Sequence, residues 1–168
     1  MNSTLLVNIF RFVILLALQI LVFNKMNFGG YANAFPYILF IILYPVNGNK
    51  ANLVIASFFL GLIMDLFCNS GGVHATACIV LAYLRPSFFK FSFGLSYEYQ
   101  TVKLNDVLTP ERFTFIFLAV ITHNIILFLL EFFDVTFILD ILIRTVLSTI
   151  YTILVCIILI YLIKPNKR

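Results

Sequence analysis

The sequence predicts an all-α integral membrane protein, a bundle of about six transmembrane helices. Of its 168 residues, 62% are hydrophobic and only 11% are charged, whereas soluble domains carry about 25% charged residues. A soluble fold of this length leaves a large share of its surface in water and could not hide so much apolar area. Lipid removes that problem, and apolar runs of membrane-crossing length recur along the chain.

Polar or turn-forming segments divide these apolar runs. A helix needs roughly 20 apolar residues to cross the hydrocarbon core, with a range of about 17 to 25. The predicted spans are residues 5–23, 31–46, 51–68, 72–89, 113–133 and 137–163 of one transmembrane domain. The second run is short and contains Pro36. Residues 90–112 form the one sizeable loop, whose FKFSFGLSYEY stretch is either an amphipathic interfacial segment or a simple connector.

The basic residues predict the orientation, because loops on the cytoplasmic side are enriched in lysine and arginine. With the N-terminus inside, the outer segments hold only Lys25, and Arg11 and Arg144 lie within spans. The inner segments hold the other basic residues: Lys50, Arg85, Lys90, Lys103, Arg112, Lys164, Lys167 and Arg168. We therefore expect a multi-pass protein with both termini in the cytoplasm, in contact with membrane lipid.

The search for catalytic and cofactor motifs finds no supported set. Gly94 to Glu98 resembles the start of a GxSxG elbow, but the last glycine is missing. There is no HExxH motif and no phosphate-binding glycine loop. The three cysteines fit packed apolar positions rather than a metal site, and no basic face is rich enough to follow nucleic acid. The sequence predicts no enzyme, no cofactor, no metal and no nucleic-acid partner.

Charged residues within the spans are informative, because burying one in lipid costs at least about 2.5 kcal/mol unless it finds a partner. Asp140 and Arg144 are four residues apart and can pair on one helix. Asp65 and Arg144 lie at similar depths, which gives a second possible pair between helices. Arg11 lies near the inner end of its span, where its side chain is expected to reach the headgroups.

Two further groups of polar residues lie in or near the fifth span. His123 and Asn124 are in its middle, and we expect each to form a hydrogen bond to another helix. Glu131 and Asp134 lie at its outer boundary, where we expect both carboxylates to be in water.

The stretch GLIMDLFCNSGGVHA predicts a tight helical hairpin between the third and fourth spans. Gly61 and Asp65 recur at a spacing of four and share one helix face with Ser57. The turn contains Gly71 and Gly72. It opens onto a stripe of small residues formed by Gly71, Ala75, Cys78 and Ala82. Small residues let membrane helices approach closely, so Asp65 is expected to face protein rather than lipid.

This hairpin resembles the signature of the rod shape-determining protein MreD family. The matching residues are Gly61, Leu62, Asp65, Leu66, Gly71 or Gly72, His74 and Ala75. Pro36 resembles a proline that the family places in its second apolar run. Length, span count and cytoplasmic termini agree over essentially the whole chain, and the Phe-rich and Asn-rich composition resembles members from the Bacteroidetes.

The resemblance implies a non-enzymatic subunit of the bacterial elongation complex in the inner membrane. Members associate with the single-pass protein MreC, which links to the MreB filament, to RodA and to a class B penicillin-binding protein. The implied fold is similar to the S-components of energy-coupling-factor transporters. A second hypothesis follows from that fold: a small-molecule binding subunit with an outward-facing pocket lined by Asp65, His74 and Arg144.

Overall fold

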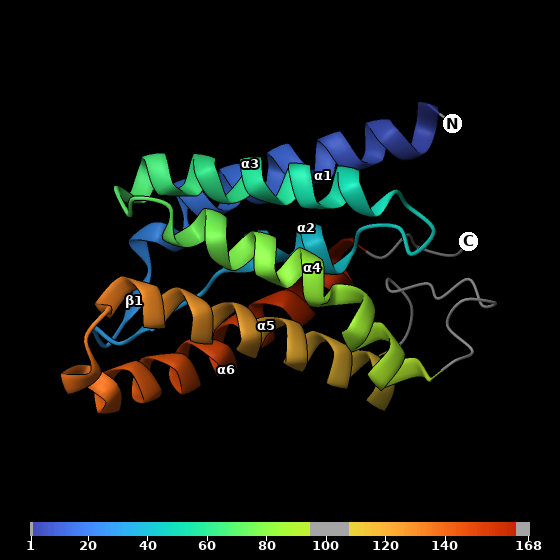
Figure 1. The fold of residues 1–168 in the computed structure, drawn as a ribbon. Coiled ribbons are helices and arrows are strands. Elements are labelled where there is room, and N and C mark those ends of the chain that lie inside the picture. The colour runs from blue at the N-terminus through green and yellow to red at the C-terminus, as the bar shows by residue number, and fades with distance from the viewer. Residues whose placement is uncertain (1, 95–107, 164–168) are drawn as a thin grey trace.

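The computed structural model describes residues 2–94 and 108–163, and within them the chain is an all-α bundle (Figure 1). Helix α1 precedes a short irregular region, and α3 to α6 follow as an antiparallel series in which α4 lies between α3 and α5. The long helices are α1 (Asn2–Leu21), α3 (Lys50–Cys68), α4 (Val73–Phe93), α5 (Pro110–Phe132) and α6 (Ile138–Ile163). Five of the six predicted segments therefore coincide with helices.

Local sequence signals set several helix ends. The Asn49 side chain accepts a hydrogen bond from Ala51 N (2.8 Å) and caps the start of α3. Thr109 caps α5, with Pro110 in the first turn, where its missing N–H costs nothing. Helix α5 ends at Phe133 in the left-handed conformation, and the 3-10 turn Val135–Phe137 leads into α6.

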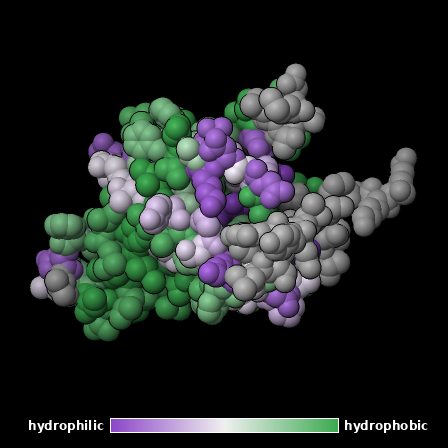
Figure 2. Space-filling view, turned by 45° about the vertical axis from the view of Figure 1, so that its right-hand side comes forward, coloured by the Kyte–Doolittle hydropathy of each residue, from purple (hydrophilic) through white to green (hydrophobic). Residues whose placement is uncertain are grey.

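Four helical segments are long and apolar enough to cross a membrane: Leu6–Lys25, Lys50–Cys68, Pro110–Phe132 and Ile138–Ile163. Their outward faces carry large apolar side chains, and Figure 2 shows a broad hydrophobic flank beside a hydrophilic region at one end. Helix α4 is of similar length but carries Arg85 and Lys90. The chain is a multi-pass membrane protein.

The prediction of a helical span at residues 31–46 is wrong. This region contains two short antiparallel strands, β1 (Asn27–Phe28) and β2 (Ala32–Asn33), in which Phe28 pairs with Ala32. A 3-10 turn (Pro36–Ile38) and the one-turn helix α2 (Leu39–Ile42) follow. Pro36 has no N–H to donate and disfavours helical geometry in the residue before it, so a continuous helix does not form through this point.

Residues 34–43 nevertheless run through the interior of the bundle alongside the second half of α1, and we call them the central segment. The Ala34 carbonyl lies beside Gln19, near the end of α1, whereas the Leu43 carbonyl lies beside Arg11, in the middle of that helix. Every residue of the central segment is buried. Irregular backbone at membrane depth is tolerated only where protein surrounds it, and here the helices do so.

The loop predicted at residues 90–112 is shorter than expected, because α4 continues to Phe93 and α5 begins at Pro110. The first part of the FKFSFGLSYEY stretch, residues 89–93, belongs to α4, and residues 95–99 lie outside the described residues.

Candidate functional site

The turn between α3 and α4 brings two backbones into direct contact at Gly61. A Cβ atom placed on Gly61 would lie 2.4 Å from Ala75 Cα and 2.5 Å from the His74 carbonyl oxygen. The turn itself uses left-handed backbone at Asn69 (φ 54°), Gly71 (φ 64°) and Gly72 (φ 102°). Glycine adopts such angles without strain, so the sequence allows α4 to begin directly against α3.

Asp65 caps the start of α4. Its Oδ1 accepts from His74 N (2.9 Å) and from the Ser70 hydroxyl (2.6 Å), and its Oδ2 accepts from Ala75 N (2.9 Å). The first N–H groups of a helix have no partner within it, and a carboxylate there satisfies them and complements the helix dipole. Asp65 is 6% exposed, and its expected position facing protein is confirmed.

Arg144 does not contact Asp65, so the predicted ion pair between them is wrong. The Arg144 guanidinium donates to the Gly30 carbonyl (3.2 Å) and lies over the rings of Tyr31 (5.1 Å) and Phe132 (5.4 Å). The two residues lie at similar predicted depths, but depth along a span does not reveal that Asp65 has backbone donors beside it.

The possible pair between Asp140 and Arg144 does not form either: Asp140 is half-buried, and the Arg144 guanidinium donates to the Gly30 carbonyl. Arg11 is half-buried and donates to the Leu43 carbonyl (2.9 Å). Its expected reach to the lipid headgroups stays a prediction. Arg11 and Arg144 thus each bind a backbone carbonyl.

Side chains from the surrounding helices satisfy the irregular backbone of residues 30–44. At the β2 end, Ser148 and Thr152 of α6 accept from Asn33 N (3.0 Å) and Phe35 N (3.1 Å). At the α2 end, Arg85 of α4 donates to the Ile42 and Tyr44 carbonyls. Because an unpaired backbone group inside a membrane costs several kcal/mol, these side chains are what allow a non-helical segment to pass through the bundle.

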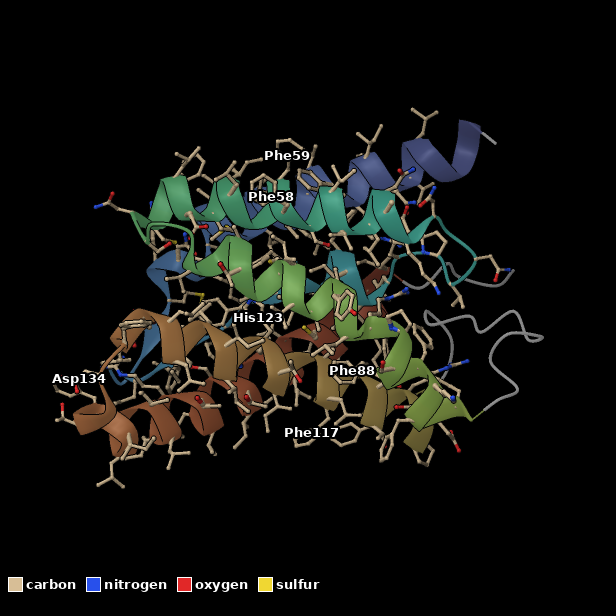
Figure 3. All side chains as sticks on the ribbon, viewed as in Figure 1. Phe58, Phe59, Phe88, Phe117, His123 and Asp134 are labelled. Carbon is tan, nitrogen blue, oxygen red and sulfur yellow. The ribbon has the colours of Figure 1, made fainter. Side chains whose placement is uncertain are left out.

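A buried hydrogen-bond network, which we call the Tyr37 network, joins the central segment to α4, α5 and α6. Its members are Tyr37, His74, His123, Asn124 and Thr149, and all five are buried. The Tyr37 hydroxyl lies 2.9 Å from His74 Nδ1 and 2.7 Å from His123 Nε2. The expected bond to another helix is confirmed for Asn124, which donates to Thr149 of α6, whereas His123 bonds to Tyr37 of the central segment instead of to another helix. Figure 3 shows His123 in the middle of the bundle.

The hydrogen bonds of the Tyr37 network determine which ring nitrogen of His123 and of His74 carries the proton. Asn124 Nδ2 donates to Thr149 Oγ1 (3.1 Å), so Asn124 Oδ1 accepts from His123 Nδ1 (3.2 Å). The bare Nε2 of His123 then accepts from the Tyr37 hydroxyl, whose oxygen accepts from His74 Nδ1. The proton of His74 is therefore on Nδ1, and its Nε2 is a hydrogen-bond acceptor.

A cavity of about 340 Å³ lies at the end of the bundle that holds the turn between α3 and α4, and we call it the hairpin-end cavity. It is lined by Gln19, Phe23, Asn24, Asn27, Asn33, Ala34, Phe35, Phe67, Cys68, Ser70, Val73, His74, Leu127 and Glu131. Of the three residues expected to line an outward pocket, the lining includes His74, while Asp65 and Arg144 are bound elsewhere. Glu131 and Asp134 are exposed, and the expectation that both carboxylates are in water stays a prediction.

Sequence reasoning missed Gln19, Tyr37, Arg85, Ser148 and Thr152. A signal was available on α6, where the buried polar residues Thr145, Ser148, Thr149 and Thr152 recur at helical spacing. Such a stripe within a span marks a face that binds protein rather than lipid. In the sequence, Arg85 indicates only the cytoplasmic side of the membrane, but in the structure it is 5% exposed and its guanidinium lies 4.7 Å from the centre of the Phe89 ring.

Across the described ranges 2–94 and 108–163, no group of three or more His, Cys, Asp or Glu side chains is arranged to hold a metal ion. Comparisons with protein-family models, with curated proteins and with solved structures give no match.

Proposed function

We propose that this protein is a non-enzymatic inner-membrane subunit of the bacterial cell-elongation complex, which regulates cell shape and peptidoglycan synthesis by binding its partners. The proposal includes six crossings, with the central segment as the second, a fold similar to that of the S-components, and both termini in the cytoplasm. The expected partners are a single-pass MreC-like protein and, through it, RodA, a class B penicillin-binding protein and the MreB filament.

One observation carries the proposal: among the residues that resemble the MreD signature, Gly61 and Asp65 act together to form the contact between α3 and α4. Gly61 permits the contact between α3 and α4, and Asp65 binds the first N–H groups of α4. A short apolar motif can match by chance, but a chance match gives no reason for its members to act together. This geometry supports the motif as a working unit and hence the family resemblance.

The exposed surface suits a scaffold. Large apolar side chains cover the outward faces of α1 and α6, including Phe10 (68% exposed) and Leu162 (74% exposed). Membrane helices associate through shape and packing rather than through the hydrophobic effect. A bundle whose centre is fixed by hydrogen bonds offers partner helices a rigid surface, and binding requires no chemistry on this chain.

The distribution of basic residues supports the orientation. Lys50, Lys90 and Arg112 lie in the terminal turns of α3, α4 and α5 at one end of the bundle, opposite the turn between α3 and α4, and Arg11 and Arg85 lie near the middle of α1 and α4. The hydrophilic region in Figure 2 lies toward this end. Under the positive-inside rule, this end faces the cytoplasm.

Co-purification tests the proposal. The tagged chain is extracted from its native membranes in a mild neutral detergent, and bound proteins are identified by mass spectrometry. We expect a single-pass MreC-like protein in stoichiometric amount, reduced for Gly61→Ala and retained for Ala51→Leu, a larger side chain at an exposed site on the same helix. Recovery of an energising transport subunit instead would contradict the scaffold and favour the second hypothesis.

That second hypothesis, a small-molecule binding transport subunit, has one observation in its favour. The hairpin-end cavity is at the end where an outward pocket was expected, and His74 lines it. Two of its three expected lining residues, Asp65 and Arg144, are bound elsewhere, so the scaffold remains the better supported function.

A further inference from the structure

The hairpin-end cavity has the size of a small-molecule site. At about 340 Å³ it lies at the lower end of the range of about 300–1,000 Å³ found for ligand pockets. Its walls combine aromatic rings with several polar side chains drawn from α1, α4, α5 and the segment around β1 and β2. Such a mixture of apolar walls and a few polar groups is typical of a binding site.

Most hydrogen-bond donors in its walls are already used within the protein. Gln19 Nε2 donates to Asn24 Oδ1 (2.9 Å) and to the Ala34 carbonyl (3.1 Å). Asn24 Nδ2 lies 3.4 Å from Cys68 Sγ, and the Ser70 hydroxyl donates to Asp65. The side-chain amides of Asn27 and Asn33 can donate or accept.

Three acceptors on the lining residues remain without a protein donor. Gln19 is 1% exposed, and its Oε1 is buried with no hydrogen-bond partner. His74 has its proton on Nδ1, bound to Tyr37, which leaves Nε2 as an acceptor. The carboxylate of Glu131 is the third. A buried acceptor such as Gln19 Oε1 is unfavourable without a donor, so these walls favour a ligand that donates hydrogen bonds.

The charged residues that line the cavity indicate the sign of the charge that a ligand would carry. Glu131 is the one charged residue in the lining, which contains neither lysine nor arginine. The guanidinium of Arg144 is outside the lining and donates to the Gly30 carbonyl, and it also attracts the Glu131 carboxylate electrostatically. Phe23, Phe35 and Phe67 add aromatic rings, whose faces attract cations and not anions.

We propose that the hairpin-end cavity binds a small organic cation, with an ammonium group that donates hydrogen bonds to Gln19, His74 and Glu131. The apolar part of the ligand packs against the phenylalanine rings. This inference is independent of the scaffold function, because it rests on the cavity alone.

Three probes with the same five-carbon chain test the charge and the hydrogen bonding separately: 1,5-diaminopentane, 1,5-pentanediol and glutarate. Binding to the purified full chain in a neutral detergent is measured by calorimetry and by the midpoint of thermal unfolding. We expect the diamine to bind and to raise the midpoint, with no effect of glutarate and a much weaker effect of the diol. Equal binding of diamine and diol, or binding of none of the three, would overturn the proposal.

Two variants locate the site. Glu131→Gln removes the charge from the lining and should weaken diamine binding about tenfold, the worth of one charge-assisted hydrogen bond. Asp134→Asn is the matched control, because Asp134 is exposed and lies outside the lining. Hydrogen bonds from Thr136 hold the pKa of Asp134 below its usual value, so the control also loses a full negative charge. If the two variants behave alike, the diamine binds to general surface charge and the assigned site is wrong.

Discussion

Gly61 and Ala75 are in backbone contact: a Cβ on Gly61 would lie 2.4 Å from Ala75 Cα. This contact sets how closely α3 and α4 approach, and it places the Asp65 carboxylate within reach of two N–H groups of α4. The hairpin thus depends on two residues four positions apart on the same helix face: Gly61, which has no side chain, and Asp65, which is charged.

Gly61→Ala should destabilise the bundle. Alanine favours a helix over glycine by about 1 kcal/mol, but here the new methyl group meets backbone atoms that cannot rotate away. We expect a net loss of about 1–3 kcal/mol in the free energy of unfolding, the usual cost of overpacking. Denaturant titration in detergent micelles measures it, with Ala51→Leu as the control. A gain in stability would show that α4 can shift without cost.

A double-mutant cycle separates the two proposed partners of Asp65. Asp65→Ala should cost about 1–3 kcal/mol, because it leaves the buried N–H groups of His74 and Ala75 without an acceptor. The coupling to Arg144→Ala should be below about 0.5 kcal/mol, the usual limit for sites that do not interact. A coupling well above that value would restore the ion pair that the sequence predicted.

Tyr37→Phe tests the buried network. The change keeps the ring but leaves one acceptor on His123 and one donor on His74 unpaired, at a cost of about 1–3 kcal/mol. Tyr83→Phe is the control, since Tyr83 is 75% exposed. Equal stability of the two variants would mean that the hydroxyl bridge carries no net energy.

The helices could be predicted closely from the sequence, because apolar runs of membrane length and turn residues such as Asn49, Gly71 and Gly72 determine them locally. The structure of residues 31–46 could not be predicted in the same way, because a buried irregular segment and a membrane helix have the same apolar composition. Only Pro36 and the paired Gly29 and Gly30 indicated a break there.

The partners of the buried charges were the other part that sequence reasoning could not supply. Depth along a span suggested Arg144 for Asp65, whereas the actual partners are backbone groups, which are the same in every sequence. One sign was available: an aspartate in the last turn of a helix, followed by a four-residue turn that contains two glycines, lies beside the free N–H groups of the next helix. The Tyr37 network joins segments far apart in the chain, and no spacing rule reveals it.

Arg85→Leu should disrupt the end of the central segment. The carbonyls of Ile42 and Tyr44 lose their donor in a buried setting, which costs about 1–3 kcal/mol for the groups left unpaired. Lys90→Leu on the same helix is exposed and should leave stability nearly unchanged. Proteolysis of the reconstituted protein in the 43–49 loop measures the opening, and equal cleavage of both variants would contradict the anchoring role of Arg85.

Depletion of the protein in its source organism, with imaging of cell outline and of newly made wall, tests the proposed role in cell elongation most directly. The account predicts rounded cells with misplaced wall synthesis, rescued by the native chain and by Ala51→Leu but poorly by Gly61→Ala. Cells that keep their rod shape after depletion, and acquire a requirement for a vitamin, would contradict it.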